Sequence, residues 1–419
     1  MRGTIAALSV TSIGELGDSV EGFPAGLAQQ LQATAVRPLP RGTSPAQVFR
    51  VSSANGELAV KVLHQGAGIA PGQGLERFLQ EPAQLQRIAK EVPALARFVV
   101  AVVGVWQQMG WAAYAMPYVD GSAAVTPTTS CSEARDRLRD AFATLTELGY
   151  ARSRASAGGT VQPHDLAELR RRLWILQRHL PEELLDGRPL KVNGRWVRPL
   201  GPLMQALESD TTVLTRIRPR LVSYPVHGEL DLTNMLSPSR SKSFTLIDPR
   251  GTRGYCDPVE DFAHALLSLT VVDRVTARGA RLWRTAPRGR RPLLYEVRSV
   301  DPDRAPYARL GPWFVDMLGA LPFGAELTRV DPYWRVRLAF THGCQALLEA
   351  SAVLSARRPP VRLAGAPSPQ KLATIFCLLG LRLLEQAIAG STTTDLPDIT
   401  TGLDDDTRAI WRWGIGRLD

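Results

Sequence analysis

The sequence predicts an α+β protein with two lobes, a small and mostly antiparallel β-sheet lobe followed by a larger and mostly helical lobe. In residues 46–63, apolar and polar side chains alternate on either side of an Asn55-Gly56 turn, a strong signal of a β-hairpin. After Gly121, apolar residues instead recur with the helical period of about 3.6 residues. A chain of 419 residues that is 44% hydrophobic suits one large or two modest domains with a sizeable core.

The order of elements supports the small first lobe. Residues 1–35 mix small, polar and glycine positions around one amphipathic stretch, so we expect an extension there, with the first lobe over 36–121 and the helical lobe over 122–419. After the hairpin, helical spacing in 75–91 is interrupted by Pro82. Two further strands are expected at Phe98–Trp106 and Trp111–Met116. The helices expected in the second lobe are 132–148, 165–179, 203–216, 259–269, 334–354 and 368–389.

The most informative segment runs from His227 to Gly251. It reads HGELDLTNML, then a mostly polar connection, then FTLIDPRG. Glu229 and Asn234 stand five residues apart in a loop, and the apolar strand Phe244–Ile247 ends on Asp248. A hairpin of this kind points a carboxylate, an amide and a second carboxylate at one spot. Phosphoryl transfer needs such a set, with one group to orient the attacking hydroxyl and two oxygen ligands for Mg²⁺.

The pattern H-x-[acid]-x4-N, followed by an apolar strand and Asp, resembles the catalytic and metal-binding loops of the protein-kinase-like fold. The glycine after His227 and the IDP around Asp248 are similar to its small-molecule branch, the aminoglycoside phosphotransferase and choline kinase group. The resemblance runs from about Val36 to Leu384 and is strongest in 227–269. A protein kinase is disfavoured, because HRD, DFG and a segment ending in APE are missing.

The resemblance implies a nucleotide site in the first lobe. Lys61 lies in the apolar strand ELAVKVLH of a chain with only five lysines, and a compact ammonium suits the phosphates of ATP or GTP. Its expected helix partner is Glu81, with Glu76 as the alternative. Because a residue before proline avoids helical geometry, the helix is expected to begin at Pro82. The segment Arg41–Ser44 either occupies the place of a phosphate-covering loop, through Gly42, Thr43 and Ser44, or forms an ordinary turn. The resemblance places the hinge, whose backbone pairs with the nucleotide base, at Met116 and Tyr118.

The catalytic base is left open by the sequence. Glu229 stands where the family usually has Asp, so three interpretations compete: a working Glu229, a shift of the role to Asp231, or a non-catalytic pseudokinase that binds nucleotide. His227 is expected to support the loop through hydrogen bonds, and Arg250 either faces phosphate or caps the turn. Two acidic residues in the following helix are expected to anchor it: Asp257 and Asp261.

The charge pattern bears on the acceptor. The net charge is +10, and 274–310 holds ten arginines, which raises the local density of anions. We therefore expect a neutral or anionic small-molecule acceptor, such as an antibiotic, nucleoside, sugar or related metabolite. Nucleic acid is disfavoured because the stretch lacks interleaved aromatic residues. No apolar run reaches the roughly 18–20 residues of a membrane span, and four scattered cysteines favour a cytoplasmic protein.

Overall fold

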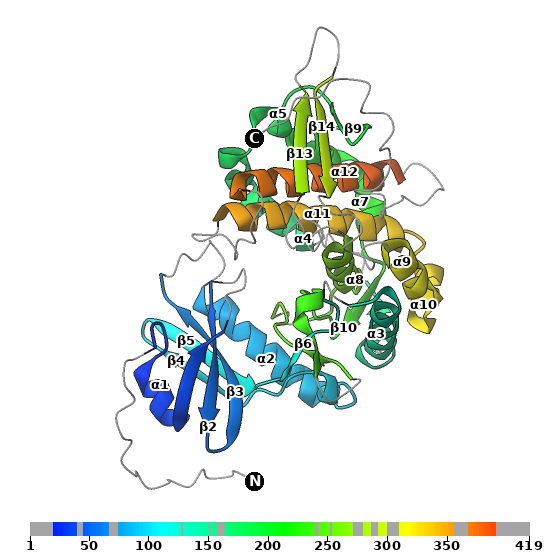
Figure 1. Cartoon of the computed structure of the whole chain (residues 1–419). Coiled ribbons are helices and arrows are strands. Elements are labelled where there is room, and N and C mark those ends of the chain that lie inside the picture. Colours follow the sequence, from blue (N-terminus) through cyan, green and yellow to red (C-terminus); the bar gives the residue numbers. More distant parts are fainter. Residues whose placement is uncertain are drawn as a thin grey trace.

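The computed structural model describes residues 20–39, 45–66, 74–126, 129–150, 152–156, 164–238, 243–251, 254–270, 280–285, 292–299, 310–355 and 368–390. A β-sheet part and a larger, mostly helical part form the two lobes (Figure 1), as the sequence predicts. The expected phosphate-covering residues Gly42, Thr43 and Ser44 lie outside the described residues.

The first lobe is built on a five-stranded antiparallel sheet in the order β1-β2-β3-β5-β4. Its strands are β1 (Ala33–Pro38), β2 (Gln47–Ser53), β3 (Gly56–His64), β4 (Gly104–Gln108) and β5 (Trp111–Pro117). The predicted hairpin is confirmed, because Ser53 pairs with Gly56 across the turn. Gly56 has φ +116°, a conformation that only glycine adopts readily.

The two faces of this sheet have different neighbours. Phe49 and Val51 point to the face covered by helix α1 (Ala25–Gln30), where Phe23 and Leu27 complete a separate small core. Residues that the sequence places in an extension before the first lobe therefore pack on its sheet. The opposite face carries Lys61 and, directly across on β5, Tyr114. Helix α2 (Leu75–Glu91) packs there, and the ring centroids of Phe78 and Tyr114 lie 5.4 Å apart.

The prediction that the helix begins at Pro82 is wrong. Helix α2 starts at Leu75 and carries Pro82, which is buried, in its interior. Glu81 is helical despite preceding proline, because its side chain is held by Lys61 and Tyr114 of the sheet. Tertiary contacts thus outweigh the local preference of a residue before proline.

The expected strand Phe98–Trp106 is also wrong before Gly104. Ala96–Phe98 form a short 3-10 turn, and β4 begins only at Gly104. Between them, Val100 donates its backbone N–H to Leu246 O at 3.0 Å. This segment leaves the sheet because its backbone pairs with the hairpin expected to hold the metal ligands.

The second lobe contains the described helices α3 (Cys131–Thr144), α4 (His164–His179), α5 (Glu182–Leu185), α6 (Leu200–Ser209), α7 (Thr211–Ile217), α8 (Val259–Leu267), α9 (Gly311–Ala320), α10 (Pro322–Val330), α11 (Trp334–Ser355) and α12 (Pro369–Gly390). Short sheets join them: β6 (Gly121–Ala123) with β11 (Met235–Pro238) and β12 (Thr245–Leu246), β7 (Arg152–Ala155) with β10 (Leu221–Tyr224), and β8 (Leu190–Val192) and β9 (Arg195–Val197) with β13 (Ala280–Thr285) and β14 (Leu294–Ser299).

The single helix expected over 203–216 is in fact two. Helix α6 begins earlier, at Leu200, and α7 begins after Asp210. The Asp210 carboxylate accepts hydrogen bonds from the backbone N–H groups of Thr212 and Val213. Such an N-cap stabilises a new helix start, so the apolar period continues across a break in the backbone helix.

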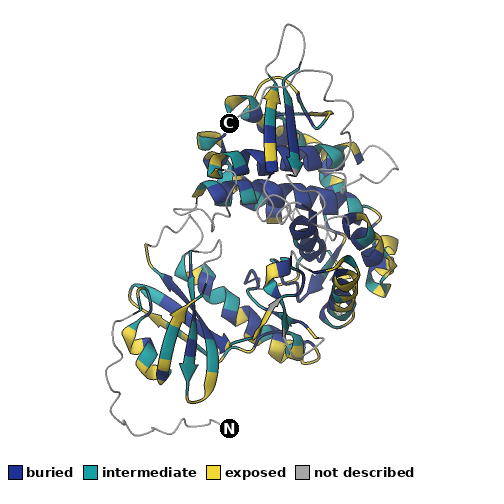
Figure 2. Cartoon of the chain, viewed as in Figure 1, coloured by how far each residue is buried: buried dark blue, intermediate teal, exposed yellow. Residues whose placement is uncertain are grey.

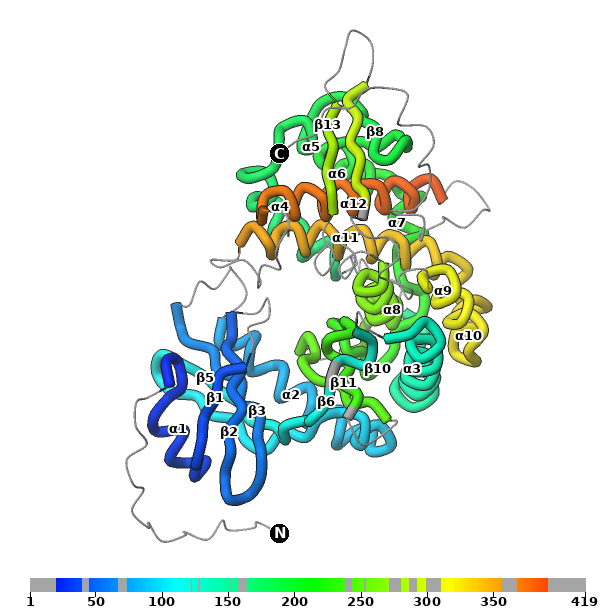
Figure 3. The backbone as a smooth tube through the Cα atoms, in the orientation of Figure 1, coloured from blue at the N-terminus to red at the C-terminus, as the bar shows by residue number. Residues whose placement is uncertain are grey.

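Helices α11 and α12 form the core of the second lobe and lie side by side (Figure 3). They approach closely because Gly343 and Gly380 face each other's helices; a Cβ on Gly380 would lie 3.0 Å from Gly343 O. Both helices are largely buried (Figure 2). Among the described helices, α12 is the one long and apolar enough to cross a membrane, although 78% of its most apolar window is buried inside the protein.

Candidate active site

Lys61 occupies the centre of the site. Its side chain is only 4% exposed, and its Nζ lies 2.8 Å from Glu81 Oε2 and 3.1 Å from Asp248 Oδ2. Burial alone would lower the pKa of Lys61, but the two carboxylates more than offset this and raise it. The ammonium is therefore charged at neutral pH. Burial together with Asp248, opposed by Lys61, raises the pKa of Glu81 to about 6.

Tyr114 links the same two carboxylates. Its hydroxyl donates to Glu81 Oε2 and to Asp248 Oδ1, each at 3.1 Å. Burial, with Asp248 and Glu81 beside it, raises the pKa of Tyr114 well above its ordinary value, so the hydroxyl stays protonated. Sequence reasoning missed this residue. Tyr114 pairs with Lys61 across β3 and β5. Once the order of the strands is known, this register places the Tyr114 side chain beside that of Lys61.

Asn234 and Asp248 lie across one hairpin. The 3-10 turn η3 (Leu232–Asn234) leads into β11, and Met235 pairs with Leu246 of β12. Ile247 N–H donates to Asn234 O at 3.0 Å, which brings Asp248 beside the Asn234 backbone. Asp248 has φ +52°, a left-handed conformation that Asp tolerates better than most residues.

The side chains of this pair suit a hard cation. Asn234 Nδ2 donates to Glu229 O at 2.8 Å, and its Oδ1 makes no hydrogen bond with a described residue. Carboxylate and amide oxygens are the protein ligands that Mg²⁺ prefers. Groups of three or more His, Cys, Asp or Glu side chains able to hold a metal are absent from the described part of the chain.

His227 supports the loop through a hydrogen bond, as the sequence predicts. It is buried, and Nε2 lies 2.8 Å from Ile247 O, which joins the two arms of the hairpin. Burial lowers its pKa, so it is neutral and donates Nε2–H to that carbonyl. Its other ring nitrogen has no hydrogen-bond partner among the described residues.

Asp261 anchors the backbone of the same loop from α8. Its carboxylate accepts from His227 N–H at 2.9 Å and from Gly228 N–H at 2.6 Å. Tyr150 O–H donates to it as well, at 2.8 Å. Asp257 holds the start of α8 through Val259 N–H and a buried ion pair with Arg337 at 2.5 Å. Both acidic residues thus anchor the helix, as the sequence predicts.

The two candidate bases point in different directions. Glu229 is 40% exposed, and its Oε1 lies 3.4 Å from Arg77 Nη2 and 3.9 Å from Arg250 Nε. Its Oε2 makes no hydrogen bond with a described residue. Asp231 instead turns to α8, where its Oδ1 lies 3.4 Å from His264 Nδ1 and accepts from Ser268 O–H at 3.3 Å.

Arg250 neither faces open solvent nor simply caps the turn. Its side chain is 7% exposed, with Glu260 at 2.6 Å, His164 at 3.0 Å and His264 at 2.9 Å. Burial would lower the pKa of Arg250, but Glu260 and other carboxylates raise it overall. It binds the hairpin to α4 and α8. The next residue, Gly251, has φ +84°, and a Cβ there would lie 2.6 Å from Gln80 Cβ of α2, so this turn touches the first lobe.

Comparison with known proteins identifies the family. A model of the phosphotransferase enzyme family matches residues 35–293, more than half of the chain.

The chain belongs to this family.

Solved structures similar to this phosphotransferase show low identity. They include an aminoglycoside phosphotransferase from Streptomyces rimosus (17% identity, TM-score 0.42, 74% of this chain and 96% of that one). A type VIII aminoglycoside-3'-phosphotransferase has 19% identity and a TM-score of 0.41, over 74% and 96% of the two chains. A fructosamine-3-kinase candidate from Haemophilus somnus has 12% identity and a TM-score of 0.46, over 86% and 95%. A search of curated proteins gives no match.

The remaining predicted residues of the phosphotransferase lie at the lobe junction or away from the site. Met116 is buried on β5 beside Tyr114, and Tyr118 follows the strand, with its ring 4.3 Å from the Arg50 guanidinium carbon. Glu76 makes no ion pair with Lys61 among the described contacts. Sequence reasoning also missed Arg77, which reaches Glu229 from the first turn of α2.

The arginine-rich stretch 274–310 is only partly described. Arg284 and Arg298 lie on β13 and β14 and pair with Glu183 and Glu296. This sheet packs on α12 and lies well away from β11 of the hairpin (Figure 3). Arginines 274, 278, 288, 290, 291, 304 and 309 lie outside the described residues, so the predicted contact of this stretch with an acceptor stays a prediction.

Proposed function

We propose that this phosphotransferase moves the γ-phosphoryl group of ATP or GTP to a hydroxyl of a small molecule, with Mg²⁺ as cofactor. The observation that carries the proposal is the cluster of Lys61, Glu81 and Asp248, with Asn234 across the hairpin from Asp248. It gathers one buried cation and two oxygen ligands at the junction of the two lobes. Phosphoryl transfer depends mainly on such positioning and charge.

Lys61 is proposed to bind the nucleotide phosphates. Glu81 and Tyr114 fix its position before the nucleotide arrives, which lowers the entropy cost of forming the site. The nucleotide base is proposed to lie at the end of β5, against the backbone near Met116 and Tyr118. The Streptomyces rimosus aminoglycoside phosphotransferase has been solved in complex with ADP and streptomycin, which supports a nucleotide co-substrate here.

Asp248 and Asn234 are proposed to hold Mg²⁺ through Asp248 carboxylate oxygens and Asn234 Oδ1. When bound, this cation neutralises charge on the phosphates. In the structure described here Asp248 contacts Lys61 and Tyr114. Those two contacts set the carboxylate plane, and the Glu229 carbonyl sets the Asn234 amide so that its oxygen is left for the cation.

Glu229 is proposed to orient the acceptor hydroxyl and take its proton. Among the described residues, the Glu229 carboxylate contacts only arginine side chains that reach it from α2 and from the hairpin, whereas Asp231 Oδ1 turns to His264 and Ser268 at α8. A glutamate is tolerable here because the base contributes less to this transfer than positioning does. His227 then acts through hydrogen bonds that hold the loop and moves no proton.

The acceptor is proposed to be neutral or anionic. A polycation needs unpaired carboxylates, and two of the described carboxylates near the base, Glu229 and Glu168, already have cationic partners. Glu229 contacts Arg77 and Arg250, and Glu168 contacts Arg172 at 2.8 Å. Binding a polycation would break these pairs in a partly desolvated cleft, where charges interact strongly. Consumption of nucleoside triphosphate also fits the cytoplasmic location that the sequence predicts.

A coupled assay of nucleoside diphosphate release tests the function. Purified protein is screened with ATP and with GTP, with and without Mg²⁺, against a panel of neutral, acidic and polycationic hydroxyl compounds. We expect acceptor-dependent, Mg²⁺-dependent release that Asp248→Ala abolishes. Release that is equal in the Asp248→Ala protein would reject the proposed site.

The same panel tests the acceptor charge. The wild-type protein should use a neutral or acidic compound better than kanamycin, a polycation. Arg77→Gln removes the nearer of the two cationic neighbours of Glu229 and should lower the KM for kanamycin relative to that for a neutral acceptor. Efficient use of kanamycin by the wild-type protein would overturn this part of the proposal and leave the phosphotransfer assignment intact.

A further inference from the structure

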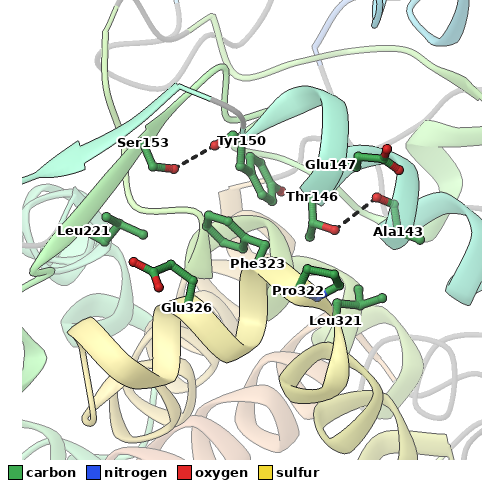
Figure 4. Close-up of a pocket in the computed structure, with 10 residues that line it drawn as sticks. All are labelled: Ala143, Thr146, Glu147, Tyr150, Ser153, Leu221, Leu321, Pro322, Phe323 and Glu326. Carbon is green, nitrogen blue, oxygen red and sulfur yellow. Dashed lines mark hydrogen bonds between the residues drawn. The ribbon is translucent and has the colours of Figure 1, made fainter.

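A pocket of about 630 Å³ lies in the helical lobe, apart from the proposed active site. It is enclosed by the end of α3 and the π-helical turn η2 (Leu145–Gly149), by β7 and β10, and by the start of α10 (Figure 4). None of these elements carries Lys61, Asn234 or Asp248. The volume falls within the range of about 300–1,000 Å³ common for small-molecule sites.

The lining combines apolar walls with acidic groups. Tyr150 and Phe323 form one wall, with ring centroids 5.2 Å apart, and Leu221 faces them (Figure 4). The charged residues among its lining are Glu147 and Glu326, both acidic. Glu326 pairs with Arg329 at 2.6 Å. Glu147 makes no ion pair with a described residue. On a chain of net charge +10, an acidic pocket of this kind favours a cation.

Tyr150 connects the pocket to the catalytic loop. Its ring belongs to the pocket wall, and its hydroxyl donates to Asp261 Oδ2 at 2.8 Å. The same carboxylate accepts the backbone N–H groups of His227 and Gly228. Burial, with Asp261 beside it, raises the pKa of Tyr150 well above its ordinary value, so the hydroxyl remains a donor. The pocket and the loop therefore share one chain of hydrogen bonds.

The backbone at this wall has an uncommon geometry. Tyr150 N–H donates to Leu145 O at 3.0 Å, the five-residue spacing of a π-helical turn, which is rare and frequent at functional sites. The turn ends α3 and places Tyr150 between Phe323 and Asp261. Ser153 O–H of β7 donates to Tyr150 O at 2.7 Å. These contacts fix the Tyr150 backbone while its ring remains part of the pocket wall.

We propose that this pocket binds a small molecule with a flat apolar body and a protonated amine, and that the bound molecule stabilises the catalytic loop through Tyr150 and Asp261. The apolar body packs on Tyr150 and Phe323, and the ammonium lies near Glu147. A ligand on the ring holds the Tyr150 hydroxyl on Asp261, so openings that release His227 and Gly228 become rarer.

Binding is tested with tryptamine, an indole with an ethylammonium group, by calorimetry or NMR titration. A probe of this size should bind with a Kd of roughly 0.1–1 mM. Tryptophol, the neutral alcohol of the same shape, should bind about three- to fivefold more weakly, the range expected for one exposed charge pair. Indole-3-propionate, an anion, should bind more weakly still. Equal binding of all three probes would overturn the assignment of a cation.

Two variants place the binding in this pocket. Ala143→Leu adds carbons to the lining and should weaken tryptamine binding at least about tenfold. Glu147→Gln should remove the preference for tryptamine over tryptophol. Asp140→Asn is the matched control, because it removes one exposed charge from α3 outside the lining. Tryptamine binding that survives unchanged in Ala143→Leu would overturn the site.

Hydrogen exchange tests the link to the loop without any turnover, so its outcome is separate from that of the proposed function. Tryptamine should slow exchange at the amides of His227 and Gly228 at least about twofold, relative to peptides from β2 and β3. In Tyr150→Phe, which keeps the ring and removes the hydroxyl, tryptamine should still bind but leave loop exchange unchanged. Unchanged loop exchange in the saturated wild-type protein, or the same slowing in Tyr150→Phe, would overturn the link.

Discussion

Replacement of Glu229 by Gln is the sharpest test of the proposed chemistry, because it keeps the shape of the side chain and removes its charge and its ability to accept a proton. The matched change is Asp231→Asn, two residues along the same loop. The structure separates the two positions. Glu229 contacts Arg77 of α2, whereas Asp231 contacts His264 and Ser268 at α8.

The magnitude follows from the role of each group. A general base contributes about 10²–10⁴ in rate, so Glu229→Gln should lower kcat at least about 100-fold, or roughly 3 kcal/mol in activation free energy. Stability should hardly change. Glu229 is 40% exposed and Arg77 28% exposed, and pairs of this kind contribute at most about 1 kcal/mol. Asp231→Asn should lower kcat less than about tenfold.

Steady-state release of nucleoside diphosphate, measured with the best acceptor of the panel, gives kcat for both variants. Nucleotide affinity is measured separately by calorimetry and should be the same as in the wild-type protein. Urea unfolding checks that both variants are folded. If Asp231→Asn is crippled while Glu229→Gln keeps nearly full kcat, the base is Asp231 and the reasoning from side-chain direction is wrong.

Three further predictions concern the metal, the lysine pair and a buried histidine. Asp248→Ala should keep the fold but reduce turnover below detection, and turnover near the wild-type level in a folded variant would sink the proposed metal site. Since the pKa of Glu81 is raised to about 6, protonation of Glu81 below that pH removes one partner of Lys61. The profile of kcat/KM against pH should therefore fall on its acidic side with an apparent pKa near 6, and this fall should flatten in Glu81→Gln. The same acidic fall in the variant would contradict this. Burial lowers the pKa of His342 to about 3, below its unfolded value of about 6.5, so its contribution to stability is full above pH 6.5 and is lost as pH falls toward 3. At pH 5 the loss should be about 2 kcal/mol in unfolding free energy relative to pH 7, and His342→Gln should reduce that difference; equal pH dependence in both proteins would count against it.

Local sequence signals determined much of the secondary structure. The Asn55-Gly56 turn between alternating runs predicts the β2–β3 hairpin, which forms around that turn. Long periodic runs predict α4, α11 and α12 to within about two residues. These predictions succeed because each depends on neighbours within one element. The motif from His227 to Asp248 is similarly local, since one hairpin brings its residues together.

Predictions from the sequence are wrong where contacts between distant segments compete with local conformational preference. Glu81 is helical before Pro82 because Lys61 and Tyr114 hold its carboxylate from the sheet. Val100 leaves the expected strand to pair with Leu246, about 150 residues away in the chain. No local pattern encodes either contact. The break at Asp210 is different, since its capping carboxylate is a local signal that the apolar period concealed.

By itself, the sequence determined the residue types of the proposed active site and their spacing, because the chemistry of phosphoryl transfer would constrain both. The tertiary structure alone decided which side chains share a space. It placed Tyr114 between Glu81 and Asp248, Arg77 beside Glu229, and Arg250 inside the helical lobe. These pairings depend on how α2 and α8 pack against the sheet and the hairpin, and such packing is set by the summed burial of many residues rather than by any one segment.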